Sequence, residues 1–212
     1  MNTWTHALIN TAVARTASFR RRGEGAPALE GRHRLSRTAT YAALIGAIAP
    51  DVPLFILTLW YWARYGFGFG PEYDLFYFND PMWIVGHSLF HAPAISLLFI
   101  AAAAIIRRPN AGEGTRRTAV ALRWFGISTL LHTAIDVPTH YHDGPLILFP
   151  FDWTFRIRAP VSYWDPAHHG IPMMIFGLAL DIALSALWIR WWRRDKRARR
   201  DADRMRRDAI LE

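Results

Sequence analysis

Long apolar runs separated by polar stretches dominate the chain. Four of these runs approach the roughly 20 residues that a helix needs to cross the hydrocarbon core of a bilayer. A fifth run, near the N-terminus, is shorter and less apolar and indicates a short span, with an interfacial helix as the alternative. In chain order, the five runs are residues 4–19, 38–66, 82–108, 118–138 and 171–192. The pattern predicts an all-α, polytopic membrane helix bundle with four to five transmembrane helices.

The composition supports a membrane protein. Of the 212 residues, 52% are hydrophobic, while 25 Lys and Arg against 17 Asp and Glu give a net charge of +8. The basic residues border the apolar runs, as is ordinary for membrane proteins. They do not cover a soluble surface, so no nucleic-acid partner is expected. The absence of cysteine excludes disulfides, thiolate metal sites and cysteine nucleophiles. In the first segment the basic residues follow the apolar part, so no cleavable signal peptide is expected.

Arginine is distributed unevenly between the connections. The arginine-rich stretches are residues 20–37, 107–117 and 190–200. The positive-inside rule places these stretches in the cytoplasm and the acidic, aromatic connections outside. The chain is then a multi-pass protein with a membrane-embedded domain in residues 1–192 and a basic, cytoplasmic helical tail in residues 193–212. Asp181, in the middle of the last apolar run, is expected to form a structural ion pair with Arg123 at a similar depth.

Ionisable side chains lie at a similar depth in four of the predicted helices. Each is 14 to 20 residues from the arginine at the cytoplasmic end of its helix, or roughly 20–30 Å at about 1.5 Å per residue. Ionisable groups inside a membrane span are costly and suggest a function. Their shared depth predicts a polar metal pocket near the outer interface. The residues are His6, Asp51, His87, His91, His132 and Asp136.

Spacing and residue type also favour metal binding. His87 and His91 are one helical turn apart, as are His132 and Asp136, so each pair shares a helix face. Imidazole and carboxylate groups without sulfur suit Zn²⁺, with Mn²⁺ or Fe²⁺ as alternatives. For His132 and Asp136 taken alone, a pair within the helix is the alternative to a metal site.

Four motifs occur in the order that is typical of a known family. They are "TH" near the N-terminus, "GAIAPDVP", "GHSLFH" and "LLHTAIDVPTHYHDGPLILFPFDW". Over most of residues 3–153, the chain resembles the bacterial inner-membrane metal-dependent hydrolases known as LexA-binding inner-membrane-associated hydrolases. The resemblance implies a location in the bacterial inner membrane and a metal-dependent hydrolase domain in residues 1–192.

A more distant likeness is to zinc-dependent phospholipase C and the fungal single-strand nucleases, which bind three zinc ions. Their H-x-x-x-D-x-x-x-x-x-H run is similar to His132, Asp136 and His142. By this likeness, Asp51 and His87 would complete one zinc site.

The same likeness implies a second zinc ion, held by His6 and bridged to the first by Asp136. The third zinc of those enzymes needs a carboxylate four residues after a later histidine, but here Met173 stands four residues after His169. The phospholipase also uses a processed N-terminal amine as a ligand, and no processing site is evident here. Two ions are therefore expected.

Such a site could hydrolyse a phosphoester, because paired metal ions polarise a phosphoryl oxygen and lower the pKa of a shared water toward about 7. Asp136 would orient that water, and His91 would act as a general acid, with a role as metal ligand as the alternative. Aromatic residues in the outer connections are typical of a membrane interface, so we expect membrane lipid as a partner and a lipid or lipid-linked phosphoester as substrate. The candidates for binding substrate are His140, His168, His169, Arg156 and Arg158. For the three histidines the alternatives are a weak third ion or plain solvated loop residues, and for the two arginines the alternative is a contact with interfacial lipid headgroups.

Two other functions stay open. The spacing His87-x-x-x-His91 and the pair His168 and His169 also suggest a membrane di-iron oxygenase. Against this, the histidine boxes of membrane desaturases contain few aspartates and face the cytoplasm. The third hypothesis is a non-catalytic, metal-binding membrane scaffold, including one that engages a LexA-type protein through the basic tail. The sequence predicts no oligomeric state.

Overall fold

The computed structural model describes residues 1–20, 29–108 and 110–211. Within the helices, the structure does not describe the side chains of residues 18–20, 29–36, 198, 199, 202, 203 and 205–211. The elements are α1 (Thr3–Arg20), α2 (Leu29–Ile48), α3 (Val52–Tyr65), α4 (Pro71–Asn79), α5 (Pro81–Ser88), α6 (Pro93–Ile106), α7 (Glu113–Asp136), η1 (Val137–Thr139), η2 (Pro166–His168) and α8 (Gly170–Leu211). The described residues contain no strand, which confirms the all-α prediction. Of the arginines predicted to be cytoplasmic, those outside the described side chains are Arg20, Arg21, Arg22, Arg32, Arg34 and Arg199.

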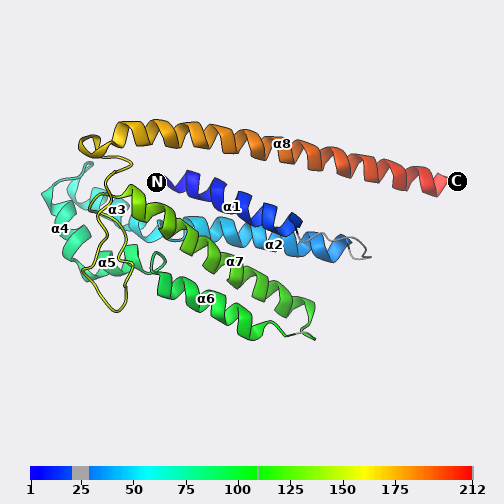
Figure 1. Ribbon diagram of the computed structural model, residues 1–212, viewed down its shortest axis with the longest axis horizontal. Coiled ribbons are helices and arrows are strands. Elements are labelled where there is room, and N and C mark those ends of the chain that lie inside the picture. Colours follow the sequence, from blue (N-terminus) through cyan, green and yellow to red (C-terminus); the bar gives the residue numbers. More distant parts are fainter. Residues whose placement is uncertain (21–28, 109, 212) are drawn as a thin grey trace.

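Helices α1, α2, α6 and α7 form a bundle in which α7 packs against the other three (Figure 1). Glycine allows two of these contacts to be close, as small residues do at helix crossings in membranes. A Cβ atom on Gly46 of α2 would lie 2.7 Å from the Phe125 carbonyl oxygen of α7. A Cβ atom on Gly126 of α7 would lie 2.6 Å from the Ser96 carbonyl oxygen of α6.

Buried hydrogen bonds also connect the bundle helices. Asn10 of α1 donates to the carbonyl and hydroxyl oxygens of Ser128 on α7, and the Ser128 hydroxyl donates to the Ala43 carbonyl oxygen of α2. Thr129 of α7 shares a hydrogen bond with Ser96 of α6. The interior of this bundle is therefore partly polar, and α1 and α7 carry much of that polarity.

Two helices in the described residues are long and apolar enough to cross a membrane, and a bent pair of helices makes a third if it is one span. They are Arg37–Tyr65, Gly170–Arg197 and the pair Pro81–Ser88 and Pro93–Ile106, which is bent by 47°. The runs predicted at residues 4–19 and 118–138 form α1 and α7 but are not among these spans, because their buried polar residues lower their hydropathy. By length and composition, two to three of the expected four to five spans are therefore found.

Two of these spans are interrupted. The turn between α2 and α3 contains Pro50 and Asp51, and the turn between α5 and α6 contains His91. Proline has no N–H donor and is best tolerated in the first turn of a helix, where Pro53 and Pro93 stand. Irregular backbone at membrane depth is tolerated only inside protein or beside a water-filled cavity. The breaks bring polar side chains to the end of the bundle at which α7 also ends.

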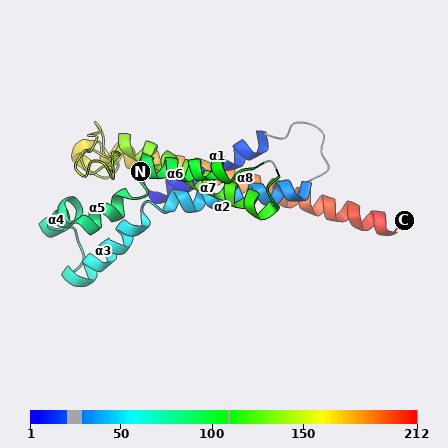
Figure 2. The ribbon, with the colours of Figure 1, turned by 90° about the horizontal axis from the view of Figure 1, so that it is seen from below.

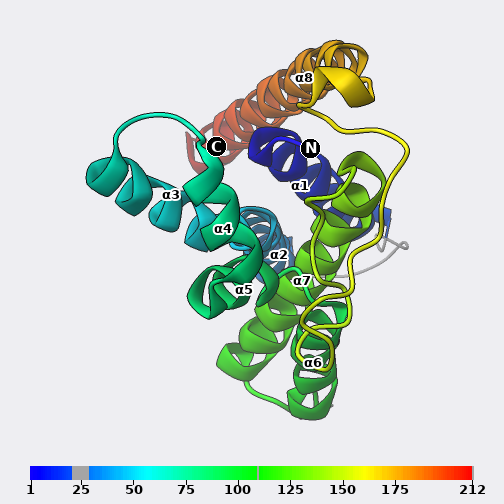
Figure 3. The same cartoon turned by 90° about the vertical axis from the view of Figure 1, so that its left-hand side faces the viewer.

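Helices α3, α4 and α5 extend beyond the bundle at the end opposite to the C-terminus (Figures 1 and 2). The loop between α7 and α8 lies at the same end, and its Leu146 and Phe149 pack with Ile84 of α5. Figure 3 shows this loop passing over α7 and α6 before it reaches α8. The three short helices are joined by an aromatic cluster with the buried members Tyr61, Tyr77 and Trp83.

Helix α8 packs along α1 and continues without a break past residue 192 (Figure 1). Arg15 of α1 forms an ion pair with Asp195 of α8 at 2.8 Å. The same guanidinium lies over the rings of Trp188 and Trp191, at 5.5 and 5.1 Å from their centroids. These contacts fix the two helices against each other near the beginning of the predicted tail.

The predicted ion pair between Asp181 and Arg123 is wrong. Asp181 of α8 instead accepts hydrogen bonds from Asn2 and Thr5. The reason is the packing order: α8 lies mainly against α1, whereas Arg123 belongs to α7.

Candidate metal centre

Four ionisable side chains meet where the two helix breaks and the end of α7 come together. Asp51 comes from the turn between α2 and α3, and His91 from the turn between α5 and α6. His132 and Asp136 come from the last turns of α7. One ligand atom from each of the four lies within 4.8 Å of all the others. Three of these side chains are buried, and that of Asp51 is partly exposed.

Backbone carbonyl groups orient the two histidine rings. His132 Nδ1 donates to the Ala47 carbonyl oxygen at 2.8 Å, and His91 Nδ1 donates to the His87 carbonyl oxygen. In the neutral form of each ring, Nε2 then carries the lone pair, as in metal-binding histidines. The Thr133 hydroxyl donates to the His91 carbonyl oxygen at 2.7 Å and holds this turn against α7. Both Nε2 atoms therefore face the carboxylates.

The distances between the facing atoms suit a shared ion. His132 Nε2 lies 3.0 Å from Asp136 Oδ2 and 3.4 Å from Asp51 Oδ1. His91 Nε2 lies 3.5 Å from Asp136 Oδ2 and 3.8 Å from Asp51 Oδ1. Ligand atoms about 2.0–2.2 Å from a tetrahedral Zn²⁺ lie roughly 3.3–3.6 Å from one another. The residues present therefore fit a four-coordinate site of nitrogen and oxygen ligands.

The second carboxylate oxygen of Asp136, Oδ1, contacts residues outside the four-residue cluster. It lies 2.9 Å from His6 Nε2 and accepts a hydrogen bond from the Met1 amino group at 2.7 Å. The His6 ring stacks on the His132 ring, with centroids 3.7 Å apart. His6 Nδ1 is buried and has no hydrogen-bond partner among the described residues. Asp136 thus connects His6 to the four-residue cluster.

Thr3 also contributes to the site, although it was not predicted as a site residue. Its hydroxyl donates to Asp51 Oδ2 at 2.5 Å. This bond fixes the Asp51 carboxylate with Oδ1 toward His132. Thr3 precedes His6 by three residues and so shares its helix face, which is the one signal in the sequence that could have indicated its role.

Besides His6, the predicted metal ligands His87 and His142 lie outside the four-residue cluster. His87 is buried one turn before His91, and both of its ring nitrogens are 3.3 Å from the Tyr77 hydroxyl. His142 is exposed, and its ring stacks against Phe78 with centroids 6.0 Å apart. His91, which was predicted as a general acid or a ligand, is the histidine of this helix pair that the structure brings to the carboxylates.

The arginines predicted to bind phosphate differ in their surroundings. Arg156 donates to the Gly144 carbonyl oxygen and lies 5.4 and 5.3 Å from the ring centroids of Tyr77 and Phe78. Arg156 therefore ties the loop between α7 and α8 to α4. Arg158 is exposed.

The loop histidines lie at different distances from the cluster. His140 Nδ1 donates to the Asp136 carbonyl oxygen at 2.9 Å and is 3.9 Å from Asp136 Oδ1. His168 Nδ1 donates to Asp165 Oδ2 at 2.7 Å, and this hydrogen bond holds the pKa of the Asp165 carboxyl below its usual range. His169 is exposed. Only His140 of the three is thus in contact with a residue of the cluster.

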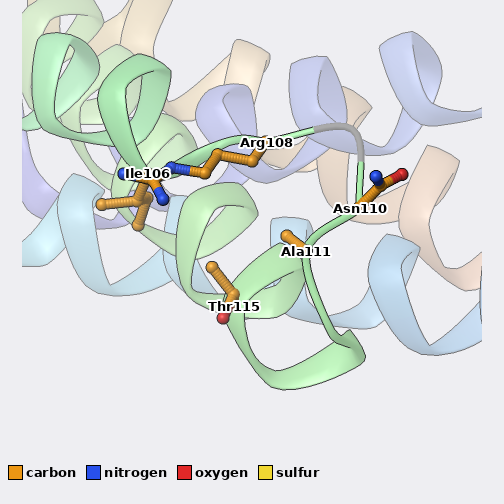
Figure 4. Close-up of a pocket in the computed structure, with 5 residues that line it drawn as sticks. All are labelled: Ile106, Arg108, Asn110, Ala111 and Thr115. Atoms are coloured by element: carbon orange, nitrogen blue, oxygen red, sulfur yellow. The ribbon is translucent and has the colours of Figure 1, made fainter.

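A separate open pocket of about 540 Å³ lies at the turn between α6 and α7, at the opposite end of α7 from the cluster (Figure 4). Its lining residues are Ile106, Arg108, Asn110, Ala111 and Thr115. None of these five residues carries an imidazole or a carboxylate. This pocket is therefore not part of the candidate metal centre.

The cluster and the apolar helices lie within one region of family similarity. No curated protein and no solved structure matches the chain. The match to one protein family extends over residues 1–198, which include all four residues of the cluster. The description of that family as an inner membrane protein agrees with the apolar spans and with the expected association with the inner membrane. The chain therefore belongs to the YdjM inner membrane protein family.

Proposed function

We propose that this protein is a multi-pass, metal-dependent hydrolase that cleaves a phosphoester in a lipid or lipid-linked substrate. The observation that carries the proposal is the convergence of ligand atoms from Asp51, His91, His132 and Asp136 within 4.8 Å. These residues come from three separate parts of the chain, and a helix break or a helix end delivers each of them. Ionisable groups collected in this way inside a membrane protein are costly and point to a function.

Zn²⁺ fits the donor atoms, with Mn²⁺ or Fe²⁺ as alternatives, because nitrogen and oxygen ligands are present without sulfur. We place a second ion on the Oδ1 side of Asp136, where His6 Nε2 lies 2.9 Å away. Asp136 would then bridge both positions. Bound ions of this type polarise a phosphoryl oxygen and lower the pKa of a nearby water.

The protein's own residues would have separate roles in substrate entry, metal binding and substrate contact. Asp51 is the most accessible residue of the cluster, with a side chain 18% exposed against 4% for Asp136, so substrate would enter from its side. His91 is better placed as a ligand than as a general acid, since its Nε2 faces both carboxylates. His140, beside Asp136, is the best placed of the loop histidines to contact the substrate phosphate or the leaving group.

A membrane substrate is supported by the aromatic surface at the same end of the molecule. Large aromatic side chains stand exposed on α3, on the following turn and on the loop between α7 and α8. Such side chains are typical of the membrane–water interface. A site at this end would meet lipid headgroups directly. The exposed aromatic residues are Phe55, Trp60, Tyr65, Phe67, Phe69, Phe151, Trp153, Phe155 and Trp164.

The proposal includes a topology. The apolar runs would cross the bacterial inner membrane so that the metal centre lies near the outer face, while the turn between α6 and α7 and the C-terminal part of α8 lie in the cytoplasm. Arg107, Arg108, Arg116 and Arg117 at that turn are exposed, as expected for cytoplasmic arginines.

The test is hydrolysis by the purified protein in vesicles of bacterial phospholipids, supplied with Zn²⁺, Mn²⁺ or Fe²⁺ in separate reactions. Released phosphorylated headgroup is measured for the wild type, for Asp136→Asn and for Asp152→Asn. Asp152 is the matched control, because its carboxylate accepts hydrogen bonds from Thr154 and Phe155 in the outer loop. We expect turnover by the wild type and the control, and a loss of at least about 100-fold in Asp136→Asn. Equal rates in all three proteins, or oxygen-dependent turnover with iron alone, would contradict the proposal.

A further inference from the structure

Helix α8 carries a carboxylate in the apolar part of a candidate span. Asp181 lies within the candidate span Gly170–Arg197, where an ionisable side chain is costly without a partner. Its Oδ1 lies 2.6 Å from the Thr5 hydroxyl, and its Oδ2 lies 3.3 Å from Asn2 Nδ2. Both partners belong to the beginning of α1, so Asp181 is directed at the N-terminal end of that helix.

Asn2 and Thr5 also determine how α1 begins. Asn2 Oδ1 accepts a hydrogen bond from the Thr5 backbone N–H at 2.8 Å, which is the contact made by an N-cap residue. The Thr5 hydroxyl has one proton and lies closer to Asp181 Oδ1 than to Asn2 Oδ1, at 2.6 against 3.0 Å. It therefore donates to Asp181, and Thr5 is completely buried beneath this contact.

The neighbouring positions of the same turn reach the metal centre. Thr3 donates to Asp51 Oδ2, and His6 Nε2 lies 2.9 Å from Asp136 Oδ1. Residues three apart lie on one face of a helix, so Asn2 and Thr5 form the face toward α8. Thr3 and His6 form the adjoining face. Any rotation of α1 about its axis that breaks one set of contacts must displace the other.

We propose that Asp181 is a positioning residue for the metal centre: by holding Asn2 and Thr5, it sets the rotation of α1 that places Thr3 on Asp51 and His6 on Asp136. This inference rests on the metal centre proposed above. The Asp181 carboxylate touches none of the four cluster residues and acts through α1. Its expected effect is that of residues that orient metal ligands, about 10–100-fold in metal affinity.

The experiment compares four variants with the wild type. Asp181→Ala removes the acceptor, and Thr5→Val removes the donor while keeping the shape of the side chain. Thr5→Ser restores the hydroxyl and serves as the conservative rescue. Asp195→Ala is the matched control, because Asp195 joins the same two helices through Arg15 at 2.8 Å but lies away from the beginning of α1. Zn²⁺ affinity is measured by competition with a chromophoric chelator, and Co²⁺ loading reports ligand geometry through its visible absorption.

We expect Zn²⁺ affinity to fall about 10–100-fold in Asp181→Ala and Thr5→Val, with an altered Co²⁺ spectrum. Thr5→Ser and Asp195→Ala should resemble the wild type, which a general loss of stability would not produce. Wild-type affinity and spectrum in Asp181→Ala, or no rescue by Thr5→Ser, would overturn the inference.

A second readout needs no metal. In metal-free protein labelled with ¹⁵N-histidine, Asp181→Ala should shift the His6 imidazole resonances and Asp195→Ala should leave them in place. If the wild type takes up no metal, the proposed function fails, and this spectrum still decides whether Asp181 positions His6. Unchanged His6 resonances in Asp181→Ala would overturn the inference whatever the metal content.

Discussion

Asp136 and His132 lie one turn apart at the end of α7, with Asp136 Oδ2 3.0 Å from His132 Nε2. The His132 Nδ1–H already donates to the Ala47 carbonyl oxygen, so in the neutral ring a lone pair faces the carboxylate. Two lone pairs this close repel each other unless a proton or a metal cation lies between them. A proton on Nε2 would satisfy one such contact. A single cation would also satisfy Asp51 and His91, which converge on the same point.

Substitution of His91 should remove the metal, whereas substitution of His87 should not. His91 Nε2 faces both carboxylates, while His87 lies against the Tyr77 hydroxyl. We expect His91→Ala to weaken Zn²⁺ binding by more than about 100-fold, since even residues that only orient ligands contribute about 10–100-fold. Equilibrium competition with a chelator measures the affinity. The opposite order, with His87→Ala the weaker binder, would favour the ligand set implied by the distant phospholipase likeness.

Gly126→Ala should destabilise the bundle. The new Cβ would lie 2.6 Å from the Ser96 carbonyl oxygen, which belongs to the α6 backbone and cannot easily move. Overpacking of this kind costs about 1–3 kcal/mol, more than the up to ~1 kcal/mol that alanine gains over glycine in a helix. Thermal unfolding in detergent measures the difference. Gly114→Ala, in the first turn of the same helix with no atom within 4 Å of its Cβ, should be neutral or stabilising, and equal behaviour of the two variants would contradict this packing.

The absence of cysteine allows the topology to be tested with single cysteines. Thr154→Cys lies in the exposed loop between α7 and α8, and Ala111→Cys lies at the turn between α6 and α7. In intact spheroplasts, a membrane-impermeant maleimide should label Thr154→Cys but not Ala111→Cys, and lysis should make both reactive. The reverse pattern would place the metal centre on the cytoplasmic side.

The acid–base behaviour of Asp165 should depend on His168. The hydrogen bond from His168, followed by that from the Ala167 N–H, lowers the pKa of the Asp165 carboxyl. Because the folded pKa lies below the unfolded value of about 3.9, this contact stabilises the turn above roughly pH 4, and the stabilisation is lost as the pH falls through the folded pKa. Titration of the Asp165 carboxyl carbon by NMR should show a higher pKa in His168→Ala. His169→Ala is the control, and an equal pKa in both variants would contradict the assignment.

The sequence allowed the class of fold and most of the candidate site to be predicted. Apolar runs and flanking arginines indicated a helical membrane protein, because both follow directly from the bilayer. Counting residues from the arginines placed Asp51, His132 and Asp136 at one depth, and the structure brings them together. The depth of a residue in the membrane follows from its position along the helix, so the rise of about 1.5 Å per residue was sufficient to predict it.

Lateral contacts could not be predicted in the same way. His87 and His91 share a helix face, and the choice between them depends on where the helix breaks and on the Thr133 hydrogen bond to the His91 carbonyl oxygen. Asp181 was assigned a partner on the wrong helix and at the wrong depth, because its partner Thr5 lies beside His6 near Asp136, whereas Arg123 lies more than three turns before Asp136 on α7. Two to three of the predicted four to five spans are found by length and composition, because α1 and α7 contain buried polar residues in place of apolar ones.

The central claim is that the carboxylates and imidazoles at the end of α7 hold metal. Elemental analysis of detergent-purified wild-type protein beside Asp136→Asn, after identical exposure to Zn²⁺ and removal of free ions, tests it most directly. We predict at least one tightly held ion per wild-type chain and none in the variant, which keeps the size of the side chain but loses its charge. Equal metal content in the two proteins, whether zero in both or one in both, would contradict the account.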